Sequence, residues 1–167
     1  SWPEAASDRG TIDDYFIAQA QFFLGEIYRL HYESLSLDGN DALEKLAETL
    51  EYKSELLLSL QGHYLRAIRV GNGYWATASG QRIGGLYENM YEHLLNSPAP
   101  NSLSAEEQSV YRLELRKKIR VLISKAINVY ERNVEAAERI GASSPFVEQT
   151  RASLKRMKDL LLADARA

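Results

Sequence analysis

The sequence contains no cysteine. Disulfide bonds, thiolate nucleophiles, iron–sulfur clusters and cysteine zinc sites are therefore excluded. Long apolar runs are also missing: the longest are Leu56 to Leu58 and Val121 to Ile123, whereas a transmembrane helix needs roughly 20 mostly apolar residues. We therefore expect no segment that spans a membrane.

The signals of an active site are equally sparse. His31, His63 and His93 are the only histidines, and no two of them form a His-x-x-x-His pair. There is no Gly-Lys-Ser/Thr phosphate loop and no Gly-x-Ser-x-Gly nucleophile elbow. Asp38-Gly39-Asn40-Asp41 lacks the alternating oxygen ligands of a calcium loop. We expect no catalytic residue, no metal and no cofactor.

The 167 residues are 45% hydrophobic and 26% charged, which suits a single domain with a sizeable core. Charge is unevenly distributed, with a net −8 over residues 1–60, −1 over 61–111 and +6 over 112–167. An acidic front and a basic back can attract opposite partners, or each other in a second copy. The chain has neither an initial methionine nor a signal-peptide pattern, so we interpret residues 1–167 as one domain within a larger protein.

Apolar residues recur at helical spacing almost throughout, which predicts an all-α fold of about five helices. Residues 1–10 are expected to be a flexible N-terminus, and the Pro-containing stretch 97–103 an inter-helix loop. Helix starts are predicted where a hydroxyl or carboxylate can cap free backbone amides, and stops where glycine can take the left-handed conformation. The predicted starts are Thr11 with Asp14, Asp41 with Glu44, Tyr74, Ser104 with Glu107, and Ser144 before Pro145; the stops are Asp38-Gly39-Asn40, Gly71-Asn72-Gly73, Asn96 and Gly141.

Apolar stripes on two of the predicted helices indicate how those helices pack. Ile12, Phe16, Phe23, Ile27 and Leu30 follow one another at spacings of three, four or seven, so we expect them to form the packed face of the first helix. The helix from about 104 to 140 carries two adjacent apolar stripes, and such a wide surface needs more than one covering helix.

An internal repeat links the two halves of the chain. Leu24-Gly25-x-x-Tyr28 and Ile83-Gly84-x-x-Tyr87 share one pattern at an offset of 59 residues, each within a helix. A glycine inside a helix costs about 1 kcal/mol relative to alanine. Its recurrence at equivalent places predicts a close approach of two helices at Gly25 and at Gly84.

These residues resemble the leucine, glycine and tyrosine of the first helix of the tetratricopeptide repeat (TPR). The standard unit has 34 residues, so the longer offset implies elongated second helices or a degenerate unit between them. Gln21 and Gly80 occupy the place of the family's tryptophan. The stretch from Ile83 to Gly141 is similar to large bacterial TPR proteins of delta-proteobacterial envelope and motility systems, whereas residues 1–70 resemble TPR hairpins only generically.

The resemblance implies a right-handed α-solenoid of stacked antiparallel hairpins and a non-enzymatic protein–protein interaction scaffold within a larger assembly. It favours the periplasm or cell envelope, with the cytoplasm left open. In the family's geometry, first-helix side chains beside the packing stripe line a concave groove. The corresponding residues here are Gln19, Phe22, Glu26, Arg29, Gln81, Glu88 and Asn89.

The long helix offers a second candidate surface, a basic band formed by Arg112, Arg116, Lys117, Lys118, Arg120 and Lys125. Its bases can pair with acids on the same helix, dock an acidic protein, or join the acidic front of another copy in a salt-sensitive contact. Nucleic acid is disfavoured because interleaved stacking aromatics are missing. We therefore also consider a self-associating structural domain, with Arg116, Lys117 and Arg120 at the contact.

Overall fold

The computed structural model describes residues 2–37 and 42–167, with side chains described from residue 12 onward. These residues form helices and loops without a strand, and helix makes up 88% of the structure. The all-α prediction is confirmed. The helices are α1 (Trp2–Ser34), α2 (Leu43–Val70), α3 (Gly73–Asn96), α4 (Ala105–Ile140) and α5 (Pro145–Arg166).

Local capping chemistry sets most of the helix ends, as the sequence predicts. Gly71 and Gly141 end α2 and α4 with positive φ angles of 93° and 66°. Ser104 and Glu107 form a reciprocal capping box at the start of α4. The hydroxyl of Ser144 accepts a hydrogen bond from the backbone of α5, whose first residue is proline.

The predicted start of the first helix is wrong. α1 begins at Trp2 and continues through Thr11, so Thr11 is not its N-cap. Proline in the first turn is compatible with a helix, and the glutamate and alanines that follow favour one. The predicted stop at 38–40 and the start at Asp41 lie outside the described residues. α1 already ends at Ser34, ahead of the predicted stop, and α2 begins after Ala42 without a side-chain cap.

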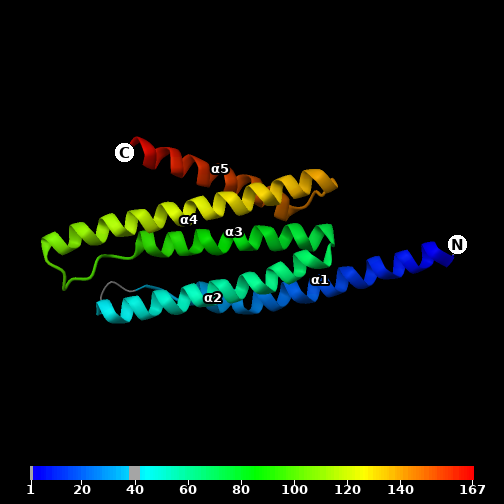
Figure 1. Cartoon of the computed structure of the whole chain (residues 1–167), viewed down its shortest axis with the longest axis horizontal. Helices are drawn as coiled ribbons and strands as arrows, with labels where there is room; N and C mark the ends of the chain where they lie inside the picture. The colour runs from blue at the N-terminus through cyan, green and yellow to red at the C-terminus, as the bar shows by residue number, and fades with distance from the viewer. Residues whose placement is uncertain (1, 38–41) are drawn as a thin grey trace.

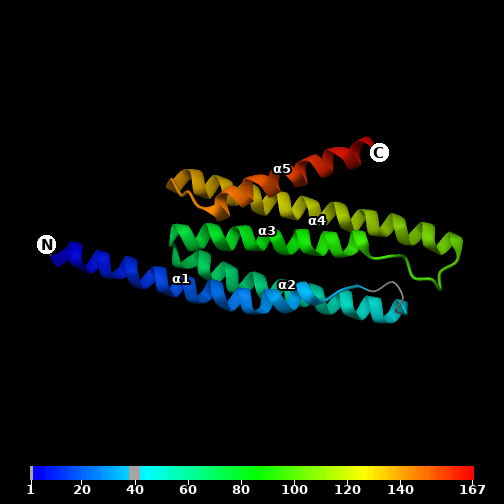
Figure 2. The ribbon, with the colours of Figure 1, turned by 180° about the vertical axis from the view of Figure 1, so that it is seen from behind.

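The five helices run back and forth along one long axis (Figures 1 and 2). α3 is central and contacts each of the other four helices. α1 pairs with α2, and α4 pairs with both α3 and α5, which confirms that the wide apolar surface of α4 needs two neighbours. Over the described residues, α2 and α4 both pack on α3, but their backbones do not come close to each other.

The predicted packed face of α1 is wrong as well. Ile12, Phe16, Phe23, Ile27 and Leu30 are all at least half exposed. The buried face instead carries smaller and aromatic residues, which allow α1 to approach α2 and α3 closely. Helical periodicity finds an apolar face but does not say which of two such faces meets the core. The buried side chains of this face include Ala18, Phe22 and Tyr32.

The two repeat glycines lie where paired helices touch, as predicted. A Cβ added to Gly25 of α1 would lie 2.6 Å from the ring of Tyr64 on α2. A Cβ added to Gly84 of α3 would lie 2.1 Å from the ring of Tyr130 on α4. Both tyrosines are fully buried, so the same glycine–tyrosine contact joins each helix pair.

No helix in the described part of the chain has both the length and the apolar character that crossing a bilayer requires.

Candidate protein-binding groove

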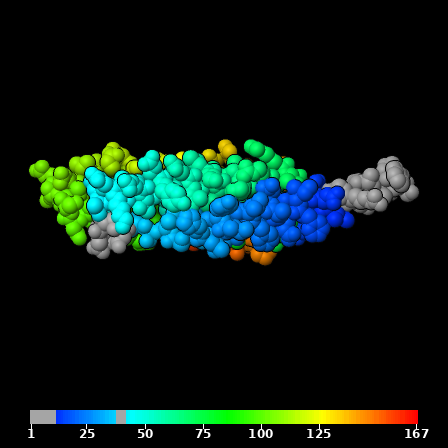
Figure 3. Space-filling model, turned by 90° about the horizontal axis from the view of Figure 1, so that it is seen from below, coloured from blue at the N-terminus to red at the C-terminus, as the bar shows by residue number. Residues whose placement is uncertain are grey.

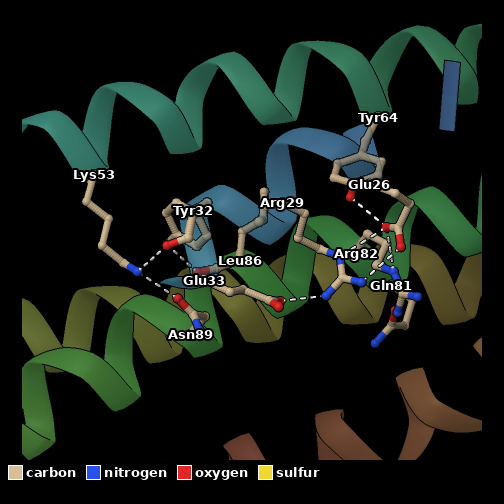
Figure 4. Close-up of polar contacts among 10 residues, drawn as sticks. All are labelled: Glu26, Arg29, Tyr32, Glu33, Lys53, Tyr64, Gln81, Arg82, Leu86 and Asn89. Carbon is tan, nitrogen blue, oxygen red and sulfur yellow. Dashed lines mark hydrogen bonds and ion pairs between the residues drawn. The ribbon is translucent and has the colours of Figure 1, made fainter. Parts of the chain in front are cut away.

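Several residues of the predicted concave surface form an internal polar network (Figure 4). The carboxylate of Glu26 accepts hydrogen bonds from Tyr64 at 2.7 Å, from Arg82 at 2.8 Å and from Arg29 at 2.9 Å. Arg29 also pairs with Glu33 at 2.6 Å. Burial would raise the pKa of Glu26, but these donors outweigh it and hold the pKa below its usual value. The network ties α1 to α2 and α3.

Most of the other residues predicted to line the concave groove are buried or contact residues of the same chain. Phe22 is only 2% exposed and belongs to the core rather than to an open surface. Gln81 accepts a hydrogen bond from Arg82, and Glu88 of α3 pairs with Arg156 of α5. Gln19 is half-buried. The surface is therefore largely occupied by contacts within the chain.

Asn89 leads to a buried lysine that the sequence analysis does not single out. Lys53 of α2 donates hydrogen bonds to the carbonyl oxygens of Tyr32 at 2.9 Å and Leu35 at 3.1 Å, and to Oδ1 of Asn89 at 2.9 Å. Its ammonium also lies 4.0 Å from the ring centroid of Tyr32. Lys53 thus binds carbonyls at the C-terminal end of α1, where the helix dipole favours a cation. One side chain joins three helices.

The three bases of the basic band that are predicted to lie at a contact are all paired within the chain. Asp164 of α5 accepts from Arg116 at 3.0 Å and also from Arg120. Lys117 pairs with Glu114 at 2.8 Å on its own helix. A partner that used these three bases would have to displace the two acids.

A hollow lies where α2 and α4 stand apart over α3. Its volume is about 740 Å³. α2 supplies one wall, α3 the floor and α4 the other wall. A smaller hollow of about 200 Å³ continues it and shares Ala47, Leu50, Leu94 and Lys118. We call this surface the α2–α4 groove, and it is lined by Leu50, Leu57, Leu58, Tyr87, Met90, Leu94, Val121 and Leu122.

Charges border the α2–α4 groove unevenly. The α4 side carries Lys117, Lys118 and Lys125, whereas the α2 side carries Glu51. Lys125 lies 5.7 Å from the ring centroid of Tyr87 on the floor. Lys118 has no ion pair among the described residues. The groove is therefore an apolar channel with a cationic edge.

The three histidines of the described residues lie on three different helices. No group of three histidine or acidic side chains in the described part of the chain is placed to hold a metal ion. His31 contacts the hydroxyl of Tyr52 at 3.2 Å, and His63 stacks on Tyr28 with ring centroids 5.2 Å apart. Burial lowers the pKa of His93. The three histidines therefore do not come together in one site.

Sequence reasoning does not find the α2–α4 groove, because the groove depends on how far apart two helices stand. Lys53 did leave a signal, since Leu46, Lys53 and Leu60 lie seven residues apart on one stripe of α2 and all three are buried. A lysine within an apolar stripe indicates a buried polar contact.

Comparison of the chain with protein-family models, curated proteins and solved structures finds no match.

Proposed function

We propose that this chain is a non-catalytic protein–protein interaction scaffold that binds a segment of a partner in the α2–α4 groove. The observation that carries the proposal is the groove itself, an open apolar channel of about 740 Å³ between two helices that both pack on α3. Binding sites are concave and mostly apolar, with a few polar groups that orient the ligand. A groove between helices is also a common seat for a peptide helix.

The edge charges indicate the kind of segment that fits. Apolar side chains of the partner would enter between Leu57, Leu58 and Val121. Acidic residues flanking them would meet Lys118 and Lys125, and charge complementarity of this kind fixes orientation and speeds association. The proposed ligand is therefore an apolar protein segment with acidic flanks.

We further propose that the helices form a TPR-like solenoid. Two observations support this arrangement. Each odd-numbered helix contacts the next odd-numbered helix as well as its even-numbered neighbour. The glycine–tyrosine contact also recurs in the α1–α2 and α3–α4 pairs. In this arrangement α2 and α4 are the second helices; α4 is longer than α3, whereas α2 is shorter than α1.

The test is a randomised peptide-display library selected on the whole chain. Leu58→Glu places a carboxylate on the groove wall and is expected to weaken the selected peptides at least tenfold, because their apolar side chains would meet a charge. Leu162→Glu is the control, since Leu162 is exposed on α5, outside the groove. Titration of labelled peptides on the two variants gives the affinities.

Selected sequences should also be richer in acidic residues than the starting library. If the peptides bind Leu58→Glu as tightly as the parent chain, the α2–α4 groove is not the binding site.

A further inference from the structure

The exposed apolar stripe of α1 is outside the α2–α4 groove and takes no part in the function proposed above. We define the α1 stripe as Ile12, Phe16, Phe23, Ile27 and Leu30, each at least half exposed. Figure 3 shows the face of the molecule on which α1 and α2 lie side by side, and on this face no other helix covers α1. Ile17, Leu24 and Tyr28 of α1 are exposed as well, and Tyr28 stacks on His63 of α2.

The internal repeat shows what this stripe corresponds to in a packed helix. The 59-residue offset that relates Gly25 to Gly84 also relates Phe16 to Trp75 and Ile27 to Leu86. Trp75 and Leu86 are buried. Trp75 packs on α1, with ring centroids 5.0 Å from Phe22 and 5.7 Å from Tyr15.

The equivalent positions in α1 have no such cover: Phe16 is 59% and Ile27 65% exposed. At Phe16 and Ile27, α1 therefore has the character of a helix-packing surface without its second helix. The same offset relates Phe23 and Leu30 to the polar residues Arg82 and Asn89.

The opposite end of the helix array differs. α5 buries one stripe against α3 and α4, and its outward positions include Arg151, Lys155, Lys158 and Asp159. Leu162 is the large apolar residue exposed on that helix. A head-to-tail contact would place the apolar α1 stripe against charged side chains, so α5 does not suit it.

The size of the stripe matches half of a dimer interface. Aromatic side chains present roughly 150–250 Å² each and aliphatic ones somewhat less, so five such side chains that are at least half exposed present on the order of 500 Å². The three flanking residues bring this close to the ~800 Å² that each partner buries in a stable complex. Monomers rarely expose so large a continuous apolar patch.

The spacing along α1 suits a second copy of the same helix. Phe16, Ala20, Phe23, Ile27 and Leu30 follow at alternating intervals of four and three. This is the spacing with which one helix packs along another. We propose that two copies of this chain associate through their α1 stripes about a twofold axis, leaving both α2–α4 grooves and both α5 helices outside the contact.

Sedimentation velocity on the whole chain tests this dimer. The parent is expected to be dimeric at micromolar concentration and to remain so as salt is raised, because an apolar contact is not screened. Ile27→Glu should raise the dimer dissociation constant at least about thirtyfold, as expected for a central apolar contact. Leu58→Glu is the matched control, because Leu58 is 66% exposed but lies in the groove.

Circular dichroism establishes that the variants fold. If Ile27→Glu loses helicity, Leu30→Glu on the same stripe replaces it. The proposal is overturned if the parent is monomeric, or if folded stripe variants dimerise as tightly as the parent. A dimer that dissociates in salt and survives Ile27→Glu also overturns it, and would instead support contact between the acidic and basic halves. Loss of peptide binding without loss of the dimer would concern the groove alone.

Discussion

Gly84→Ala is expected to destabilise the folded chain by roughly 1–3 kcal/mol, the usual cost of overpacking. The added Cβ would lie 2.1 Å from Cε1 and 2.5 Å from Cδ1 of Tyr130. Tyr130 is fully buried, so its ring has no solvent-facing position to move into. α3 and α4 would have to separate, and a larger residue such as leucine would cost more. Urea unfolding followed by circular dichroism measures the change.

Gly85→Ala is the matched control for this prediction. Gly85 is the next residue on the same helix, and an added Cβ there has no atom within 4 Å. Alanine should therefore stabilise α3 by about 0.5–1 kcal/mol through helix propensity. Equal stabilities of Gly84→Ala and the parent would show that the close contact with Tyr130 relaxes at no cost.

Gly25→Ala should fall between these two variants. Its added Cβ would lie 2.6 Å from the ring of Tyr64, a less severe overlap than at Gly84. The same order of effects in both pairs of helices would also support their structural equivalence.

The helix ends could be predicted from the sequence because they depend on neighbours only a few residues away. Ser104 and Glu107 cap each other, and Gly71 and Gly141 need only their own backbone freedom. The start of α1 was predicted wrongly because Thr11 and Asp14 match a capping pattern, and the same residues can also lie within a helix. Local patterns thus predicted the ends at Gly71, Ser104, Gly141 and Ser144 and misplaced both ends of α1.

The surfaces were harder to predict because they depend on the arrangement of whole helices. α1 has two apolar faces, and Phe16 and Ile27 lie on the exposed one. Polar residues expected in an open groove, such as Glu26 and Asn89, contact residues of other helices instead. The repeat glycines were predictable because a mid-helix glycine at two equivalent places has a steric meaning that does not require knowing the partner.

The stability of the fold should rise between pH 8 and pH 10 because of Lys53. Burial lowers the pKa of its ammonium to about 8 in the folded chain, an effect that Glu33 partly offsets. In the unfolded chain the pKa returns to 10.5. Below pH 8 both states bind the proton and folding bears the full cost of burying the charge. Between the two pKa values the unfolded chain binds more protons, so the free energy of unfolding increases with pH.

The gain should be roughly 1–2 kcal/mol, since one pKa unit corresponds to about 1.4 kcal/mol. It ends near pH 10, because burial raises the pKa values of Tyr32, Tyr64 and Tyr130. Above pH 10 these tyrosines ionise more readily in the unfolded chain and favour unfolding. His93 has a lowered pKa, below its usual 6.5, and therefore titrates outside this window.

Lys53→Met separates the lysine from the other groups. Methionine keeps an unbranched side chain of similar length without a titratable amine, so the variant should lose the rise between pH 8 and pH 10 while keeping the decline above it. Its stability at any single pH is a poorer test, because removing the ammonium relieves a buried charge but leaves the carbonyls of Tyr32 and Leu35 without this donor. Urea unfolding of parent and variant at several pH values measures the slopes. Parallel pH profiles for the two proteins would mean that Lys53 keeps its ordinary pKa in the fold, with water reaching its ammonium.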